Sequence, residues 1–192
     1  MCHDRPFTVH DYLIDHDQQT QTATISDTIW NTAQVEAKDS DNGNALGIGA
    51  VNQGRIDQAA KAFTTFAEAG NTDAQYNLGV LLATLLDPPD LGEARRWWTA
   101  AAEAGHIDAQ TNLGILLATK LDPPDLGEAR RWLTAAAEAG HTDAQCNLGV
   151  LLATVLDPPD LVEARRWYTT AAEAGHTDAA EALSRLQPEP DK

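Results

Sequence analysis

From residue 71 onward, apolar side chains recur at helical spacing in two kinds of segment that alternate along the chain. In the segment 142–156, the apolar residues stand three or four positions apart, as on one face of an α-helix: Ala144, Leu148, Leu151 and Leu152. The segment 161–172 carries a second such stripe: Leu161, Ala164, Trp167 or Tyr168, Ala171 and Ala172. The pattern predicts two helices joined by a short turn.

This predicted helix pair occurs three times with almost the same sequence, in residues 71–105, 106–140 and 141–175. Each copy ends in glycine, and the period is 35 residues. A fixed period of this size is typical of a repeat array, in which each unit buries its apolar faces against its neighbours. The predicted fold class is therefore an all-α solenoid of stacked antiparallel helix pairs.

Residues with strong positional preferences bound the predicted helices of the third copy. Thr142 is the expected N-cap of the first helix, with Gln145 reaching back to complete a capping box. The Asp-Pro-Pro sequence after this helix ends it, because proline lacks an amide hydrogen and keeps the preceding residue out of the α region. Asp160 is expected to cap the second helix together with Glu163, and Gly175 to end it in a left-handed conformation.

Two further positions carry information about packing. A glycine recurs inside every first helix, at Gly79, Gly114 and Gly149. Glycine costs a helix up to about 1 kcal/mol relative to alanine, so its recurrence indicates that a neighbouring helix comes too close for a Cβ. The tryptophans Trp97, Trp132 and Trp167 are expected in the core. The next position, Trp98, Leu133 or Tyr168, varies in size, so its pocket is expected to differ between copies.

The chain outside the three copies divides into four segments. Residues 1–40 are predicted to be weakly ordered, with a short helix over 25–35, and residues 41–70 to form a degenerate leading repeat. Residues 176–186 begin a fourth copy, stay polar and stop, as a terminal capping helix does. Residues 187–192 are rich in proline and acidic residues and are predicted to be disordered.

The charge narrows the classes of partner. The formal net charge is −16, which repels nucleic acid and anionic membrane surfaces and favours neutral or basic protein partners. No apolar run approaches the roughly 20 residues that span a bilayer. No secretory signal pattern is evident at the N-terminus. The expected location is therefore the cytoplasm.

A longer motif runs through each copy: Ala-x-x-x-Leu-Gly, followed by Ala-x-x-Trp-(aromatic)-x-x-Ala-Ala-x-x-Gly. The first copy matches it with Ala74, Leu78, Gly79, Ala94, Trp97, Trp98, Ala101, Ala102 and Gly105. Over residues 41–186 the sequence thus resembles the Sel1-like repeat, a subclass of the tetratricopeptide repeat (TPR) superfamily. It departs from that family in the turn, where Asp-Pro-Pro-Asp replaces the usual glycines. The resemblance implies a right-handed superhelix, first helices that line a concave ligand groove, and an adaptor role without chemistry.

An asparagine precedes each Leu-Gly pair, at Asn77, Asn112 and Asn147. In TPR domains an asparagine at this place can hydrogen-bond the backbone of an extended peptide, so the resemblance makes these residues candidates for the groove. The alternative is a structural asparagine that bonds an adjacent turn or helix.

Aspartates stand near the start of the same helices, at Asp73, Asp108 and Asp143. Stabilisation of the helix dipole, worth about 0.3–1 kcal/mol each, is the favoured interpretation. If they also face the groove, they disfavour an acidic ligand. Lys120 is the one basic residue in these first helices, so we expect no binding of acidic C-terminal tails.

Two sets of positions differ between the otherwise similar copies: Tyr76, Thr111 and Cys146, and Leu85, Lys120 and Val155. Selectivity in a repeat protein has to come from such positions; the alternative is neutral drift at exposed sites.

Other recurring polar residues favour structural interpretations. The arginine pairs at 95–96, 130–131 and 165–166 are expected on a solvated face, with Glu93 and Arg96 as an i,i+3 ion pair. His106, His141 and His176 recur at the helix starts. Packed helices lie about 8–10 Å apart, too far for these histidines to share a zinc ion whose ligands stand at about 2 Å. No phosphate loop, nucleophile elbow or cofactor motif is present.

The leading hypothesis is a non-enzymatic protein-interaction module that binds a peptide or protein segment in its groove and uses no cofactor. One alternative assigns the specific docking or regulatory activity to residues 1–40, with the array as support. A less favoured alternative is an enzyme with a site between repeats.

Overall fold

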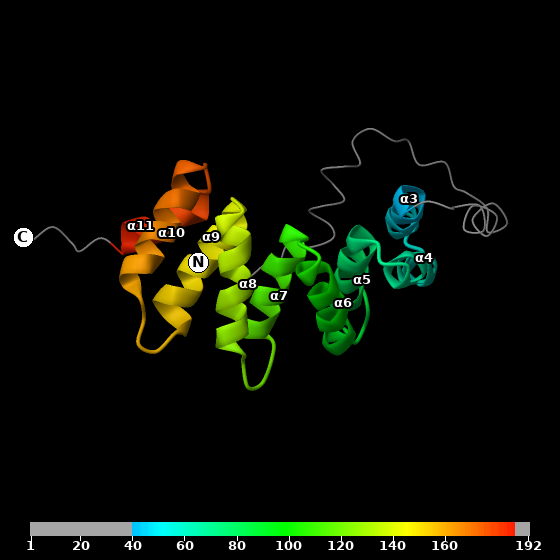
Figure 1. The fold of residues 1–192 in the computed structure, drawn as a ribbon, viewed down its shortest axis with the longest axis horizontal. Helices are drawn as coiled ribbons and strands as arrows, with labels where there is room; N and C mark the ends of the chain where they lie inside the picture. The colour runs from blue at the N-terminus through cyan, green and yellow to red at the C-terminus, as the bar shows by residue number, and fades with distance from the viewer. Residues whose placement is uncertain (1–39, 187–192) are drawn as a thin grey trace, which may run out of the picture. The chain divides into compact units, whose positions relative to one another are not determined.

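The structure is a computed structural model that describes residues 40–186, with side chains from residue 44 onward. The predictions for residues 1–39 and 187–192 lie outside this range. The described chain is helical throughout and contains no strand: α3 Ser40–Asn52, α4 Ile56–Glu68, α5 Thr72–Thr84, α6 Leu91–Glu103, α7 Ile107–Thr119, α8 Leu126–Glu138, α9 Thr142–Val150, α10 Leu161–Glu173 and α11 Thr177–Arg185 (Figure 1). A π-helical turn, Leu151–Val155, follows α9. The predicted all-α solenoid is confirmed.

The helices form two compact units, which divide between His106 and Ile107. In the first unit, α3 packs on α4, α4 on α5, and α5 on α6. In the second unit, α7 packs on α8, α8 on α9, α9 on α10, and α10 on α11. Within each unit, therefore, each helix packs on its neighbours in the sequence, as expected for repeats that are not stable alone.

The glycine inside each first helix lies against the second helix of the same repeat. A Cβ at Gly79 would lie 2.5 Å from the Trp98 ring, and a Cβ at Gly114 would lie 2.6 Å from Leu133 Cγ. Gly149 has Tyr168 at the same place, also at 2.6 Å. The predicted close approach is confirmed. One position thus accommodates three side chains of different size because the glycine leaves room for each.

The repeated tryptophans are buried, as predicted. Trp97, Trp132 and Trp167 are each less than a tenth exposed. The arginine that precedes each one in sequence folds back over its ring, with the guanidinium carbon 4.1–4.4 Å from the ring centroid. The tryptophan therefore has the core on one side and a cation on the other, an arrangement that the sequence analysis did not anticipate.

The second helices begin and end as the sequence predicts. The Asp160 carboxylate accepts a hydrogen bond from the Glu163 amide at 3.1 Å, and Asp90 and Asp125 do the same in the other copies. Gly175 has φ +95°, and the His176 amide donates to the Ala171 carbonyl at 2.9 Å. This is the Schellman arrangement of a helix end.

The predicted start of the first helix in the third copy, α9, is wrong. Thr142 is not the N-cap of α9; His141 holds that position, and its imidazole accepts the hydrogen bond from the Ala144 amide at 3.2 Å. Gln145 does not complete a capping box. Its side-chain amide donates instead to the Ala137 carbonyl at the end of α8, at 3.1 Å. The correction has a physical reason: Thr142 already has helical geometry, so the preceding residue is the one placed to cap.

Candidate functional site

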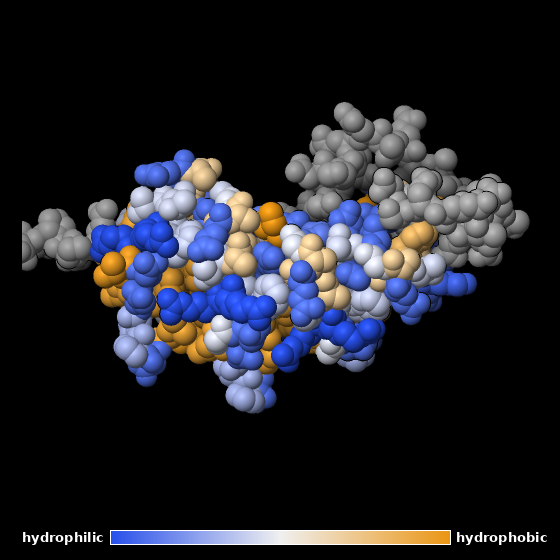
Figure 2. All heavy atoms as spheres, in the orientation of Figure 1, coloured by the Kyte–Doolittle hydropathy of each residue, from blue (hydrophilic) through white to orange (hydrophobic). Residues whose placement is uncertain are grey.

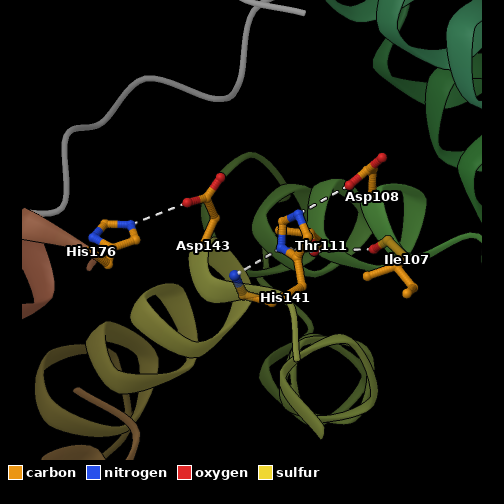
Figure 3. Close-up of polar contacts among 7 residues, drawn as sticks. Ile107, Asp108, Thr111, His141, Asp143 and His176 are labelled. Carbon is orange, nitrogen blue, oxygen red and sulfur yellow. Dashed lines mark hydrogen bonds and ion pairs between the residues drawn. The ribbon is translucent and has the colours of Figure 1, made fainter. Parts of the chain in front are cut away.

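His141 joins two helices through its two ring nitrogens (Figure 3). Its Nδ1 accepts the hydrogen bond from the backbone amide of Ala144 in α9, at 3.2 Å. Its Nε2 lies 3.0 Å from Oδ1 of Asp108 in α7. Since Nδ1 uses its lone pair as the helix cap, the ring proton of neutral His141 is on Nε2 and is donated to Asp108. One imidazole therefore caps one first helix while it bonds the preceding one.

The same pairing occurs in every copy. His106 Nε2 lies 3.5 Å from Asp73 Oδ1, and His176 Nε2 lies 3.2 Å from Asp143 Oδ1. The two partners are always 33 residues apart. Asp73, Asp108 and Asp143 thus make a contact beyond the predicted dipole stabilisation, because each bonds the histidine that follows the second helix of its own repeat. The constant spacing was the available sequence signal.

The surroundings of His141 favour its protonated form. The hydrogen bond that His141 donates to Asp108 and the charges of Asp108 and Asp143 raise the pKa of His141 above its usual value of 6.5, although burial acts in the opposite direction. The imidazole side chain remains 26% exposed, so it can exchange protons with solvent.

Two of the first set of variable positions, Tyr76 and Thr111, lie next to these histidines. The Tyr76 ring stacks on the His106 ring, with centroids 4.6 Å apart. Thr111 Oγ1 lies 3.3 Å from His141 Nδ1. Tyr76, Thr111 and Cys146 are 5%, 4% and 0% exposed. All three lie in the interior, so the variation at this position presents no side chain to solvent, and the exchange of Tyr76 for Thr111 changes the surroundings of the terminal histidine.

The second set of variable positions is accessible. Leu85 and Val155 are each 36% exposed, and Lys120 is exposed as well. All three stand at the C-terminal ends of the first helices or in the turn that follows. These residues therefore remain candidates for direct contact with a partner.

The three candidate asparagines have different surroundings. Asn77 donates from Nδ2 to Oδ1 of Asn44 in α3, at 2.7 Å, a bond between α3 and α5. Asn112 in α7 is 7% exposed, and Asn147 in α9 is half-buried. Within residues 40–186, the side chains of Asn112 and Asn147 have no hydrogen-bond partner. Asn77 therefore acts as a structural asparagine that bonds a neighbouring helix. The other two amides retain hydrogen-bonding capacity.

The arginine pairs lie on the outer surface of the second helices, as predicted. Arg96 and Glu93 form the expected ion pair at 2.8 Å, and the other two copies repeat it. Arg165 donates to the carbonyl of Leu186, the residue that follows α11, at 2.5 Å. The face drawn in Figure 2 is largely hydrophilic, with apolar patches between the polar residues. Val162, which is 82% exposed, takes the place of Gly92 and Gly127 in the other copies.

No group of three or more histidine, cysteine, aspartate or glutamate side chains among the described residues is arranged to hold a metal ion. Between residues 40 and 186, no helix has the length and apolar character needed to cross a membrane.

These features define an α-solenoid of the TPR type, in which the three near-identical helix pairs each end in a paired histidine. The model of the Sel1 repeat matches residues 72–106, 107–141 and 142–176, more than half of the chain, and the chain belongs to the Sel1 repeat family. The family register begins one residue later than the predicted one, so the terminal histidine is the last residue of its repeat. Sel1 repeat proteins are generally protein-interaction scaffolds, and their fold is typically a non-enzymatic module.

Two solved structures are similar to this chain. One is a Sel1 repeat protein from Oxalobacter formigenes, with 25% identity and a TM-score of 0.69 over 98% of this chain and 83% of that one. The other is c5321, a protective antigen of uropathogenic Escherichia coli strains that displays an SLR fold, with 28% identity and a TM-score of 0.71. That match covers 85% of this chain and only 36% of c5321. No curated protein matches the sequence.

Proposed function

We propose that this protein is a non-enzymatic adaptor that binds an extended peptide or protein segment along its first helices and uses no cofactor. One observation carries the proposal: the amides of Asn112 and Asn147 lie on the contacting helices α7 and α9 and have no hydrogen-bond partner among the described residues. A carboxamide offers both donors and an acceptor, as an extended peptide backbone requires. Asn112 is also nearly buried, which makes an unmet hydrogen bond costly.

The charges near Asn112 and Asn147 favour a neutral or basic ligand. Asp108 and Asp143 stand one turn before the two asparagines on the same helices, whereas α7 and α9 contain no lysine or arginine, and Lys120 directly follows α7. An acidic peptide would meet carboxylates with little basic compensation. The net charge of −16 acts in the same direction and disfavours nucleic acid and anionic membranes as partners. The proposal assumes the cytoplasm as the place of action.

The test is a binding measurement on two variants of the full chain, Asn112→Ala and Asn147→Ala. Fluorescence anisotropy with a library of neutral, basic and acidic extended peptides would identify a binder and its affinity. Each lost hydrogen bond is worth about 0.5–1.5 kcal/mol, so each variant is expected to raise the dissociation constant by roughly two- to tenfold. Asn77→Ala is the matched control because its amide already bonds Asn44.

Three outcomes would contradict parts of this proposal. Tight binding of acidic tails would remove the charge argument. Unchanged affinity in the Asn112 and Asn147 variants would show that a binder uses other surfaces, such as the second-helix face. A chain without residues 1–39 that folds but loses its binder would place the docking activity in that segment, with the array as its support.

A further inference from the structure

The bonds of His141 change with its protonation state. In the neutral ring, Nδ1 accepts the Ala144 amide hydrogen bond and Nε2 donates to Asp108. After protonation, Nδ1 carries a hydrogen and can no longer accept. The ring then needs an acceptor near Nδ1, and the first turn of α9 loses its cap.

Thr111 supplies that acceptor. Its hydroxyl hydrogen is donated to the Ile107 carbonyl at 3.1 Å, so the oxygen lone pairs remain free to accept. This oxygen lies 3.3 Å from His141 Nδ1. Asp108 and Thr111 are one turn apart on α7, and both bond the same ring (Figure 3). An imidazolium at His141 is therefore held at both nitrogens by α7 alone.

We propose that His141, Asp108 and Thr111 form a proton-operated clasp, in which protonation moves the imidazole from a bridge between α7 and α9 to a bond with α7 only and releases the first turn of α9. We call these three residues the clasp. The proposal rests on their geometry and is independent of the peptide-binding role. Asp108 from α7, which accepts the ring hydrogen, and the charge of Asp143 from α9, which itself pairs with His176, raise the pKa of His141 above its usual value of 6.5.

Two features make this junction respond to a proton. The helix that loses its cap, α9, passes directly into the π-helical turn Leu151–Val155, whereas α5 and α7 are regular α-helices of thirteen residues. At the variable position, Thr111 places its hydroxyl oxygen 3.3 Å from His141 Nδ1, whereas Tyr76 stacks its ring on His106 and Cys146 stands at the same position in the third repeat.

The chain contains its own non-titrating reference. The cap of α5 is Asn71, whose side-chain oxygen accepts the Ala74 amide at 2.6 Å. Asparagine performs the capping role of His141 but cannot take up a proton near neutral pH. The variant His141→Asn should therefore keep the cap of α9 and lose the clasp.

The experiment is a pH titration of the full chain by NMR, with ring ¹⁵N shifts for His141 and amide shifts for Ala144 and Ala74. We expect neutral His141 to carry its proton on Nε2, and the Ala144 amide to titrate with the His141 midpoint while the Ala74 amide does not. Thr111→Val should lower the His141 midpoint, and Asp108→Asn should lower it further. Thr119→Val is the matched control, because that hydroxyl bonds only the Ile115 carbonyl on the same helix.

The outcomes are decisive in both directions. An Ala144 amide that stays fixed while His141 titrates would overturn the clasp, as would a midpoint that Thr111→Val leaves at the wild-type value. If Thr111→Val does not fold, Thr111→Ala and Asp108→Asn provide the same comparison. In His141→Asn, the Ala144 transition should disappear with the fold intact; its persistence would show that another group causes it.

Discussion

Asp108 and His141 are 33 residues apart in the sequence, and their side chains meet at 3.0 Å. This contact fixes the start of α9 against the start of α7, so it sets the relation between two consecutive first helices. The same pairing in the other repeats makes it a structural element of the array. Because one partner is a histidine, the strength of the contact depends on pH.

The stability of the protein is expected to depend on this histidine in a defined direction. The pKa of His141 is raised in the folded state, so the folded state binds its proton more tightly than the unfolded state does. The resulting stabilisation is fully present below the unfolded value of about 6.5 and is lost as pH rises through the folded pKa. Urea unfolding followed by circular dichroism should show this difference between wild type and His141→Asn.

The comparison between variants is necessary because the net charge of −16 also changes with pH. Protonation of other groups reduces repulsion in both proteins, and the difference between them isolates His141. Equal pH dependence of wild type and His141→Asn between pH 5.5 and 8.5 would contradict the expectation.

A Cβ at Gly114 should destabilise the second unit. It would lie 2.6 Å from Leu133 Cγ and 3.3 Å from the Ala129 carbonyl oxygen, so α8 would have to move. Overpacking of this kind costs about 1–3 kcal/mol, and Gly114→Ala should lower the urea midpoint accordingly. Gly127→Ala is the matched control, because its Cβ would meet only Asp125 Oδ1 at 3.8 Å. That control should be neutral or stabilise by up to about 1 kcal/mol, and equal losses in both variants would contradict the packing argument.

Local rules predicted most of the fold because the relevant interactions lie within a few residues. The Asp160 cap, the Gly175 helix end and the close approach at Gly149 follow from residue type and period. The role of His141 did not follow, because threonine is a far commoner cap than histidine and Thr142 stands one residue away. Its pairing with Asp108 depends on how α7 and α9 pack against each other. In the sequence, this packing is visible only as a constant spacing between aspartate and histidine.

The candidate site was predicted less well for the same reason. The asparagine position was found from its recurrence, but near-identical sequence did not imply identical surroundings: Asn77 bonds Asn44, whereas Asn112 and Asn147 have no partner among the described residues. The position of Thr111 was recognised as variable, but its burial beside a histidine depends on tertiary packing.

The stacked arginines offer a test of side-chain packing on the second helices. Residues adjacent in a helix do not normally face each other, yet the Arg131 guanidinium carbon lies 4.3 Å from the centroid of the Trp132 ring. Trp132→Ala should cost roughly 3–5 kcal/mol because the ring is almost entirely buried. Arg131→Ala removes the cation–π contact, worth about 0.5–1 kcal/mol at an exposed site, together with the exposed ion pair to Glu128, and its loss of stability is measured by urea unfolding. Arg130→Ala is the control, since no ring contact or ion pair involves Arg130 in the described structure; a loss as large as that of Arg131→Ala would remove the stacking explanation.

The left-handed glycine at the end of α8 should be intolerant of substitution although space is available. Gly140 has φ +91°, and a Cβ there would meet no atom within 4 Å. The cost of Gly140→Ala is therefore conformational, about 1–2 kcal/mol for an L-residue in a left-handed conformation. Gly140→Asn should recover part of this loss, because asparagine visits that conformation more readily. Thermal unfolding of both variants distinguishes the two origins: a steric clash would make Asn, the larger residue, worse than Ala, whereas a conformational cost makes it better.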